Sequence, residues 1–600
     1  MKKLTYIVLW LSALVVIACA LLLYESNLLW KMQEMNLFLC TSMFFHEQML
    51  VPGGLLSWIA SFFTQFFYWP WFGILLLCAW WLLLMWMTKR TFRIPDQWTS
   101  LMLIPVGLLL LTIVDTGYWL YVLKLKGYSF VATIGTTAVV ALLWAFRSMP
   151  AKRYLRTVFV FVACAVGYPL LGIYGLAAPL LMAVWSWRLK EHALVNTIVA
   201  LLSVVAVPLL CYRFVYYQTN LANIYYAALP LYYVTEEHHA YYVPYYLLAL
   251  FYVMLAIMPI KSLSTAKSLK TQLLQAVVLL LLVTGVVHFW FKDENYHHEL
   301  AMQRSIEQLD WEGVLKEAAL QKDEPTRAIV MMKNLALARL GRQGNEMYLY
   351  KNGSKDYAAP FGMRTMLVVG PLIYYQYGLL NYSVRLCTEM GVEFGWRAEL
   401  LKNLSKCAIL HNEQAPARKY LGLLSHTLTF SDWAEQTRKL VGDSVAIAKH
   451  PELGFVVHMM HYDNDLSSDQ GFVERFLMNQ LAQSTYKDDP LFQEQTLLAS
   501  LWTRNPKQFW YHFYDYVTTH DQNSIPIYYQ QAACLFANME GRNLDNVPFS
   551  KGVRESFEQF MQAASNYNNA DVDVAREGLY PFFGQTYYYE YFLMDRLPEY

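Results

Sequence analysis

The sequence predicts an all-α membrane protein, with a polytopic bundle of about nine transmembrane helices followed by a helical-repeat domain in water. Two observations lead to this prediction. Long apolar runs alternate with short charged loops over residues 4–291, whereas charged residues return at ordinary density over residues 292–600. In the second half, short apolar-periodic stretches alternate with helix-breaking residues, a pattern typical of stacked helical pairs. We therefore expect a transmembrane bundle over residues 1–291 and an α-helical domain over residues 292–600.

Each expected span approaches the roughly 20 apolar residues that cross a bilayer. The first follows Met1-Lys2-Lys3, a start that also occurs in signal peptides, but its apolar run is long for one, so we expect an uncleaved span. The fifth and sixth spans are short and meet in a turn at Gly167–Gly175. The expected spans cover residues 4–24, 70–88, 98–114, 128–146, 155–170, 172–187, 193–212, 242–260 and 271–291.

Lysine and arginine residues fall in alternate loops of this bundle. The N-terminus and the loops after the second, fourth, sixth and eighth spans carry Lys2, Lys3, Lys89, Arg90, Arg93, Arg147, Lys152, Arg153, Arg156, Arg188, Lys190, Lys261, Lys267 and Lys270. The opposite loops hold only Lys31, Lys124, Lys126 and Arg213. Because basic loops stay in the cytoplasm, the pattern predicts a multi-pass protein of the bacterial inner (cytoplasmic) membrane, with a cytoplasmic N-terminus and a periplasmic C-terminal domain.

Two loops on the expected outer side are too long for simple turns. Residues 25–69 are rich in Leu, Phe and Met and break at Pro52-Gly53-Gly54, which predicts two interfacial amphipathic helices joined by a corner. Residues 213–241 are rich in tyrosine and contain Glu236-Glu237-His238-His239. Tyrosine rings stack on sugars and also suit the membrane interface, so this loop is either a substrate contact or an interfacial anchor.

Two acids directly follow spans on the expected outer side. Glu25 follows the first span and Asp115 follows the third. An acid at the hydrocarbon boundary is costly unless it is hydrated, paired or metal-bound, so it marks a candidate functional site. The alternative is that both acids only mark where helices leave the bilayer. His46 and Glu47 in the first outer loop favour a site.

Over about the first 260 residues, this layout resembles the GT-C fold of polyprenyl-dependent glycosyltransferases and oligosaccharyltransferases. Members of that superfamily have a cytoplasmic N-terminus, a long first outer loop with two interfacial helices, an acid after the first span and another near the outer end of the third. Glu25, the Pro52-Gly53-Gly54 corner and Asp115 match these positions, and Phe45-His46-Glu47 is similar to first-loop motifs. No DxD or ExD pair follows Asp115, and a glutamate stands where an aspartate is usual, so a requirement for a divalent cation stays open.

The resemblance implies transfer of a sugar or oligosaccharide from a polyprenyl-phosphate-linked donor to an envelope protein or glycan on the outer face of the membrane. Its catalytic candidates here are Glu25, Asp115, Glu47 and His46, of which Glu25 and Asp115 could hold a cation. Its candidate substrate contacts are Lys124, Lys126, Arg213, Tyr217, Glu236 and His238. The alternative for the three cations is contact with lipid headgroups. A net charge of +1 gives no reason to expect a nucleic-acid partner.

Residues 292–600 are expected to form a degenerate TPR-like solenoid. Asn334–Gly341 and Tyr375–Arg385 resemble TPR helices, and the apolar side of Ser305–Ala319 predicts a helix. Gly341 follows a periodic stretch and is a suitable C-cap. Such a domain could bind an acceptor, or it could recruit envelope proteins in a non-catalytic membrane scaffold, which is the alternative function. No Walker A, GxSxG, HExxH or Rossmann motif is present, so soluble NTPase, hydrolase and dehydrogenase functions lack support.

Overall fold

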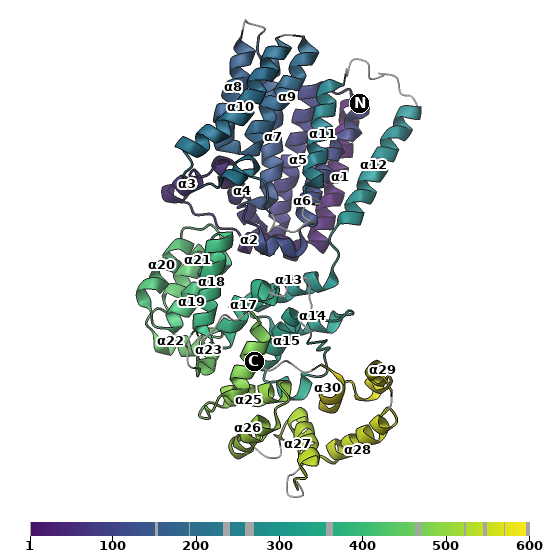
Figure 1. Ribbon diagram of the computed structural model, residues 1–600, viewed down its shortest axis with the longest axis vertical. Helices are drawn as coiled ribbons and strands as arrows, with labels where there is room; N and C mark the ends of the chain where they lie inside the picture. Colours follow the sequence, from purple (N-terminus) through teal and green to yellow (C-terminus); the bar gives the residue numbers. More distant parts are fainter. Residues whose placement is uncertain are drawn as a thin grey trace. The chain divides into compact units, whose positions relative to one another are not determined.

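The computed structural model describes residues 2–150, 154–190, 192–231, 241–258, 269–355, 364–462, 466, 471–520, 524–543, 549–568 and 570–595. All regular elements in these ranges are helices, which confirms the all-α class (Figure 1). The chain divides into two compact units. The first comprises residues 1–292, 391–399 and 422–435, and the second comprises residues 293–390, 400–421 and 436–600.

Among the described residues, each expected span of the first unit holds an apolar helix. Their bounds are α1 (Lys2–Tyr24), α5 (Pro70–Phe92), the 3₁₀ helix η2 (Asp96–Met102) with α6 (Leu103–Val114), α7 (Tyr128–Ser148), α8 (Leu155–Leu171), α9 (Ile173–Leu189), α10 (Ala193–Phe214), α11 (Val243–Ile257) and α12 (Leu269–Phe289). Six apolar segments are long enough to cross a membrane, namely Ile7–Tyr24, Pro70–Phe92, Asp96–Val114, Tyr128–Ser148, Ala193–Phe214 and Gln272–Phe289. α8, α9 and α11 are shorter, at 17, 17 and 15 residues. The unit has the helices of a membrane protein, and nine crossings stay a prediction.

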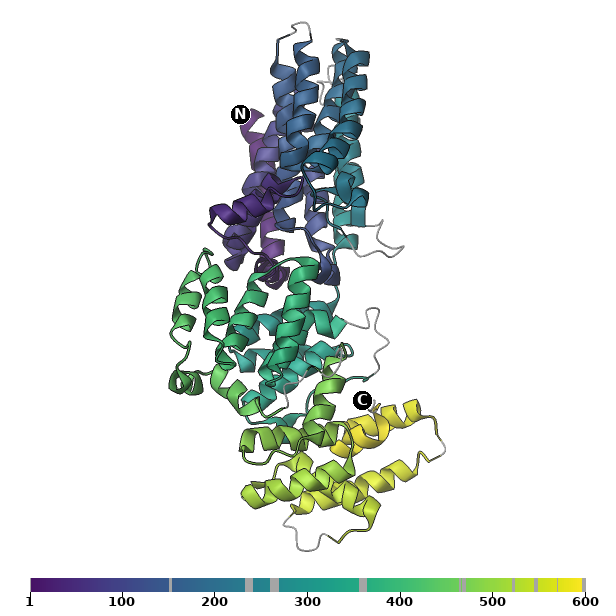
Figure 2. The same ribbon diagram turned by 60° about the vertical axis from the view of Figure 1, so that its left-hand side comes forward.

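Consecutive helices of this bundle run in opposite directions, so their connections alternate between two ends (Figures 1 and 2). At one end, Arg147 of α7 donates a hydrogen bond to the carbonyl of Thr91 near the end of α5. At the other end, the backbone N–H of Phe291 donates to the carbonyl of Val114 at 3.2 Å. We call the first the basic end, which carries Arg90, Arg93 and Arg147, and the second the acid end, which carries Glu25 and Asp115.

The packing of the bundle depends on apolar and small residues where helices meet. α5 contacts α1 and α7, and its Trp81 is fully buried, with the indole N–H donating to Thr133 of α7 at 3.1 Å. At the turn between α8 and α9, a Cβ on Gly175 would lie 2.1 Å from the carbonyl carbon of Gly167. Because no side chain fits there, the two glycines let the α8 and α9 backbones touch.

The first expected outer loop folds into more helices than the two predicted. It holds α2 (Ser26–Glu34), α3 (Ser42–Gln48), α4 (Gly54–Thr64) and the 3₁₀ helix η1 (Gln65–Tyr68). The corner between α3 and α4 is the expected one, and Gly53 adopts a left-handed φ of 81° in it. The Gly53 N–H donates to the carbonyl of Pro169 at 2.9 Å, and α4 packs against α7 and α8. α4 is therefore part of the helical bundle. The second loop holds the 3₁₀ helix η4 (Leu221–Tyr226) before residues 232–240, which lie outside the described residues.

The rest of the chain forms shorter helices, and several consecutive ones pack in pairs, such as α24 with α25. Their bounds are α13 (Glu294–Glu307), α14 (Trp311–Leu320), α15 (Arg327–Arg339), α16 (Gln343–Glu346), α17 (Arg364–Gln376), α18 (Leu380–Phe394), α19 (Ala398–Leu410), α20 (Gln414–Leu424), α21 (Ser431–Arg438), α22 (Ser444–Lys449), α23 (Leu453–Met459), α24 (Val473–Gln483), α25 (Pro490–Trp502), α26 (Pro506–Thr519), α27 (Ile527–Glu540), α28 (Lys551–Ser565), α29 (Val572–Phe583) and α30 (Tyr587–Leu593). These pairs are compatible with a helical-repeat domain, and the TPR-like assignment stays a prediction.

Two local predictions for this region have opposite outcomes. Gly341 adopts a left-handed φ of 65° after α15, which confirms it as a helix-ending residue. The prediction of one helix over Ser305–Ala319 is wrong, because α13 ends at Glu307 and α14 begins at Trp311. The reason is Asp310, whose carboxylate accepts a hydrogen bond from the Gly313 N–H at 2.9 Å and so starts a new helix.

Buried ion pairs lie in the core of the second unit. Arg327 of α15 donates from Nε to Glu474 of α24 at 2.6 Å, and the indole of Trp502 donates to the same carboxylate at 2.8 Å. Lys355 pairs with Glu590 of α30 at 2.7 Å. Burial by itself would raise the pKa of Glu474, but the charge of Arg327 and the hydrogen bonds hold it below its ordinary value. Each of these acids is matched by a cation, as buried charges in a structural core must be.

Candidate functional site

Glu25 lies at the acid end, directly after α1 and at the N-cap position of α2. Its side chain is only 1 % exposed, and the indole N–H of Trp290 donates a hydrogen bond to its Oε1 at 2.5 Å. Burial raises the pKa of Glu25 to about 7, and the hydrogen bond from Trp290 opposes this to a smaller degree. At neutral pH, this carboxyl group is therefore poised between its charged and neutral forms.

Asp115 directly follows α6 at the same end of the bundle. It is half-buried, and its carboxylate has no hydrogen bond or ion pair to any other residue that the structure describes. Burial raises the pKa of Asp115 to about 7. Of the two acids, Asp115 is thus the one whose carboxylate is open to another molecule.

Trp290 and Phe291, the two residues after α12, connect the surroundings of Glu25 with those of Asp115. Trp290 bonds to Glu25, while the backbone of its neighbour Phe291 bonds to Val114, the residue before Asp115. The Phe291 ring also lies over Gly117, where a Cβ would come within 2.7 Å of the ring. A two-residue segment therefore fixes the loop after α1 and the loop after α6 against each other.

That Glu25 and Asp115 hold a divalent cation stays a prediction. Over the described ranges, no group of three or more His, Cys, Asp or Glu side chains lies close enough to hold a metal ion. Glu25 is also enclosed and bonded to Trp290, so its Oε1 is already occupied. The site's chemistry is therefore that of two carboxyl groups with raised pKa values, one enclosed and one open.

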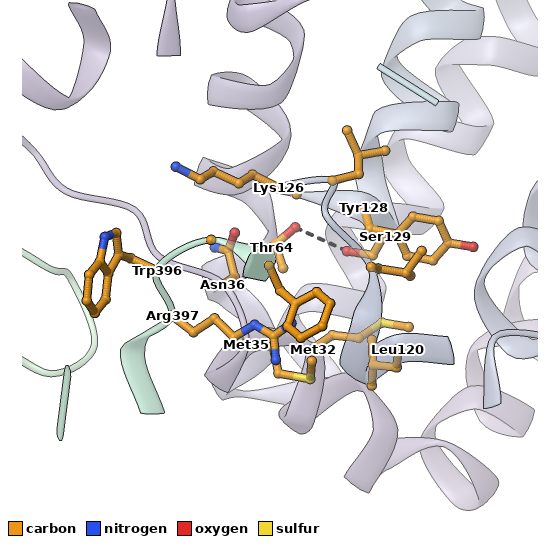
Figure 3. A pocket seen from close by; sticks show the side chains of 15 residues that line it. Met32, Met35, Asn36, Thr64, Leu120, Lys126, Tyr128, Ser129, Trp396 and Arg397 are labelled. Atoms are coloured by element: carbon orange, nitrogen blue, oxygen red, sulfur yellow. Dashed lines mark hydrogen bonds between the residues drawn. The ribbon is translucent and has the colours of Figure 1, made fainter. Parts of the chain in front are cut away.

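A small pocket of about 40 Å³ lies past the far end of α2 (Figure 3). At a rise of about 1.5 Å per residue, Met32 lies roughly 10 Å along the chain from Glu25. Thr64 and Ser129 share a hydrogen bond of 3.1 Å across the pocket, and Asn36 bonds to the carbonyl of Ser61 at 2.9 Å. A volume of this size holds only a few water molecules.

Two cations from distant parts of the sequence line this pocket. Lys126 lies between α6 and α7, and its Nζ is 3.8 Å from Glu47 Oε1 and 5.6 Å from the centre of the Phe44 ring. Burial lowers the pKa of Lys126, and Glu47 counteracts this in part. Arg397, from the segment 391–399, is buried and donates to the carbonyl of Tyr121 at 2.7 Å. Figure 3 shows the Lys126 amine pointing away from the Thr64–Ser129 pair.

The structure brings some of the predicted site residues together. Glu47 pairs with Lys126, and the Trp290-Phe291 segment connects the loops that carry Glu25 and Asp115. His46 is exposed on α3 beside Phe45.

The remaining predicted contacts lie elsewhere. Lys124 forms an ion pair with Glu393, in which Nζ lies 2.7 Å from Oε1. Arg213 is exposed in the last turn of α10, and the hydroxyl of the exposed Tyr217 donates to the carbonyl of Phe214 at 3.0 Å. These contacts tie none of the three to either acid. Glu236 and His238 fall among residues 232–240, outside the described residues.

Sequence reasoning missed Trp290 and Arg397. Trp290 ends the last apolar run and has the signature of an interfacial aromatic residue, so no local signal marks it as a partner of Glu25. Arg397 follows Glu393-Phe394-Gly395-Trp396 in the half expected to be a separate domain. Only an observed contact could assign it to the pocket.

The comparisons with known proteins leave the function open. The family described as "Family of unknown function (DUF6057)" matches residues 2–595. No curated protein matches the chain, and no solved structure does.

Proposed function

We propose that this chain, which belongs to that family of unknown function, is a membrane glycosyltransferase. It would move a sugar or oligosaccharide from a polyprenyl-phosphate-linked donor to an envelope acceptor. The observation that carries the proposal is the state of Asp115. Its carboxylate stands at the end of a membrane-length helix, half-exposed and without a described partner, with a pKa of about 7. A general base works best when its pKa is near the operating pH.

Asp115 acts as the base in the proposed reaction. It takes the proton from an acceptor hydroxyl while that oxygen forms a bond to the anomeric carbon of the donor sugar. The bond from this carbon to the phosphate oxygen breaks, and its electron pair leaves with the polyprenyl phosphate. Near pH 7, Asp115 can therefore be ionised before it takes the proton and neutral afterwards.

Lys126 and Glu25 have supporting roles in this proposal. Lys126 lies on the same connection between α6 and α7 as Asp115, and its only described ion pair is the loose contact of 3.8 Å with the exposed Glu47. An amine in such a contact can turn to the developing phosphate charge. Glu25 is a positioning residue, because it holds Trp290 and, through Phe291, the backbone next to Asp115.

A non-catalytic membrane scaffold is the second candidate function. The size of the Lys126 pocket favours it, because about 40 Å³ is far below the roughly 300 Å³ at which small-molecule sites begin. In that case the helical pairs of the second unit would recruit envelope proteins, and the acids would only end their helices.

The test compares lipid-linked sugars in cells. Lipids are extracted from cells with the wild-type chain, with Asp115→Asn, with the control Glu558→Gln on the exposed side of α28, and with no chain. Mass spectrometry then measures the polyprenyl-phosphate-linked sugars. We expect the same donor to accumulate with Asp115→Asn and with no chain, but not with the control. A donor pool that is unchanged even without the chain, with envelope proteins co-purifying with the full chain, would favour the scaffold.

A further inference from the structure

A second pocket lies at the basic end of the bundle, opposite the acids. Its volume is about 580 Å³, within the range of pockets that hold small-molecule ligands. Residues from the end of α5 and the segment after it form most of the wall, and Trp144 of α7 completes it. The pocket therefore opens where two membrane-length helices end.

The charge of this pocket is not balanced by its own acids. Lys89 pairs with Asp96, the one acid in the lining. Arg90 lies 5.9 Å from the Trp86 ring centre, and neither it nor Arg93 has an ion pair within the described part of the chain. Two guanidinium groups thus face the pocket region without a counter-charge.

Arg147 and Arg188 at this end pack against Trp185, whereas Arg90 and Arg93 line the pocket. Arg147 donates to the carbonyl of Thr91 and lies 5.5 Å from the Trp185 ring, and Arg188 lies 4.6 Å from the same ring. Arg93 is exposed at the C-terminus of α5 in a left-handed conformation, with φ of 54°, where glycine or asparagine is usual. Because its side chain is exposed on the pocket wall, Arg93 is available for binding.

The walls of the pocket suit a lipid. The side chains of Trp86 and Trp144 are 47 % and 50 % exposed, and indole rings are favoured at the depth of lipid headgroups. A guanidinium group binds two phosphate oxygens at once through parallel hydrogen bonds. The tryptophans would lie beside the glycerol and upper acyl chains while the arginines hold the phosphate.

We propose that this pocket binds the phosphate headgroup of an anionic membrane lipid through Arg90 and Arg93. The site is independent of the proposed glycosyl transfer, because it lies at the other end of the bundle and shares no residue with the acid site.

Native mass spectrometry of the full chain in detergent tests the proposal. The chain is titrated with dioleoyl phosphatidylglycerol and, separately, with dioleoyl phosphatidylcholine, which carries no net charge. The wild type should bind one phosphatidylglycerol molecule more tightly than it binds any further phosphatidylglycerol molecule. Arg90→Gln with Arg93→Gln should weaken this binding by at least about tenfold, since one hydrogen bond to a charged group is worth roughly that factor. Lys316→Gln with Lys507→Gln removes the same charge from exposed positions of the second unit and should leave this binding unchanged.

A gain of affinity provides a second readout that does not depend on removing arginines. Asp96→Asn removes the one acid in the pocket lining and should tighten phosphatidylglycerol binding several-fold. Equal binding by wild type and the Arg90/Arg93 variant, or an equal loss in the Lys316/Lys507 control, would overturn the proposal. Displacement of the lipid by millimolar inorganic phosphate would also overturn it, because the site would then take a soluble phosphate.

Discussion

Two buried glutamates of this protein, Glu474 in the second unit and Glu25 in the first, have similar exposure, but their pKa values are shifted in opposite directions. Each is about 1 % exposed, and each accepts a hydrogen bond from a tryptophan indole. Arg327 also bonds to Glu474, and the pKa of that acid lies below its ordinary value. For Glu25, burial outweighs the bond from Trp290, and its pKa rises to about 7. A buried acid whose charge is held by a cation serves the fold, whereas one whose pKa lies near 7 changes its protonation state around neutral pH.

The largest expected effect comes from breaking the matched pair. Arg327→Met leaves Glu474 buried without its cation and should destabilise the second unit by about 3–5 kcal/mol. Chemical denaturation of the purified chain, followed by limited proteolysis of residues 293–600, measures the loss. Arg342→Met is the control, because its pairs with Glu312 and Glu346 are largely exposed and should contribute less than about 1 kcal/mol. Equal losses in the two variants would show that burial does not distinguish the pairs.

A smaller effect is expected from the pH dependence that Glu25 gives to the first unit. Its folded pKa of about 7 lies above the ordinary 4.5, so the folded state binds the proton more tightly. This tighter proton binding stabilises the folded state by on the order of 3 kcal/mol. The full contribution is present below pH 4.5, and it is lost as pH rises through about 7. Glu25→Gln should reduce the slope of the stability of the first unit between pH 5 and pH 8, and Asp115, whose pKa is also about 7, should supply the slope that remains.

Thermal unfolding of the chain at several pH values checks this, with Glu312→Gln on the exposed side of α14 as the control. Glu474 gives the opposite sign, since its lowered pKa supplies stability above the unfolded value that is lost in acid. A Glu25→Gln variant that keeps the wild-type slope from pH 5 to pH 8 would contradict the assignment of that slope to Glu25.

The smallest loss of stability is expected at Asp115. Its carboxylate is half-buried and has no described partner, so Asp115→Asn breaks no described bond. Because burial raises the pKa of this acid, the variant should leave the unfolding free energy at pH 7 unchanged or raise it. The same variant should abolish the proposed sugar transfer. Thermal unfolding beside the lipid-linked sugar assay separates the two roles, and a loss of stability comparable to that of Arg327→Met would make Asp115 a structural acid.

Many local features of both units could be predicted from the local sequence. An apolar run near 20 residues long forms a helix wherever it lies, and each expected span does so within the described residues. The corner at Pro52-Gly53-Gly54 and the helix end at Gly341 also follow from the residues themselves, because glycine tolerates the left-handed φ found there. The break at Asp310 was missed because the apolar pattern continues across it.

The candidate site was predictable only in part. The sequence by itself determined that Glu25 and Asp115 end apolar helices on the same side of an alternating bundle, since helix length and chain direction are local properties. Only the tertiary structure decided which acid is enclosed by Trp290 and which stays open, and that Arg397 reaches the pocket of Lys126. It likewise decided that Glu474 meets an arginine 147 residues away, while Arg90 and Arg93 form no ion pair with any residue that the structure describes. The physical reason is that a charge is matched or left open by packing between distant segments, which no local pattern of residues encodes.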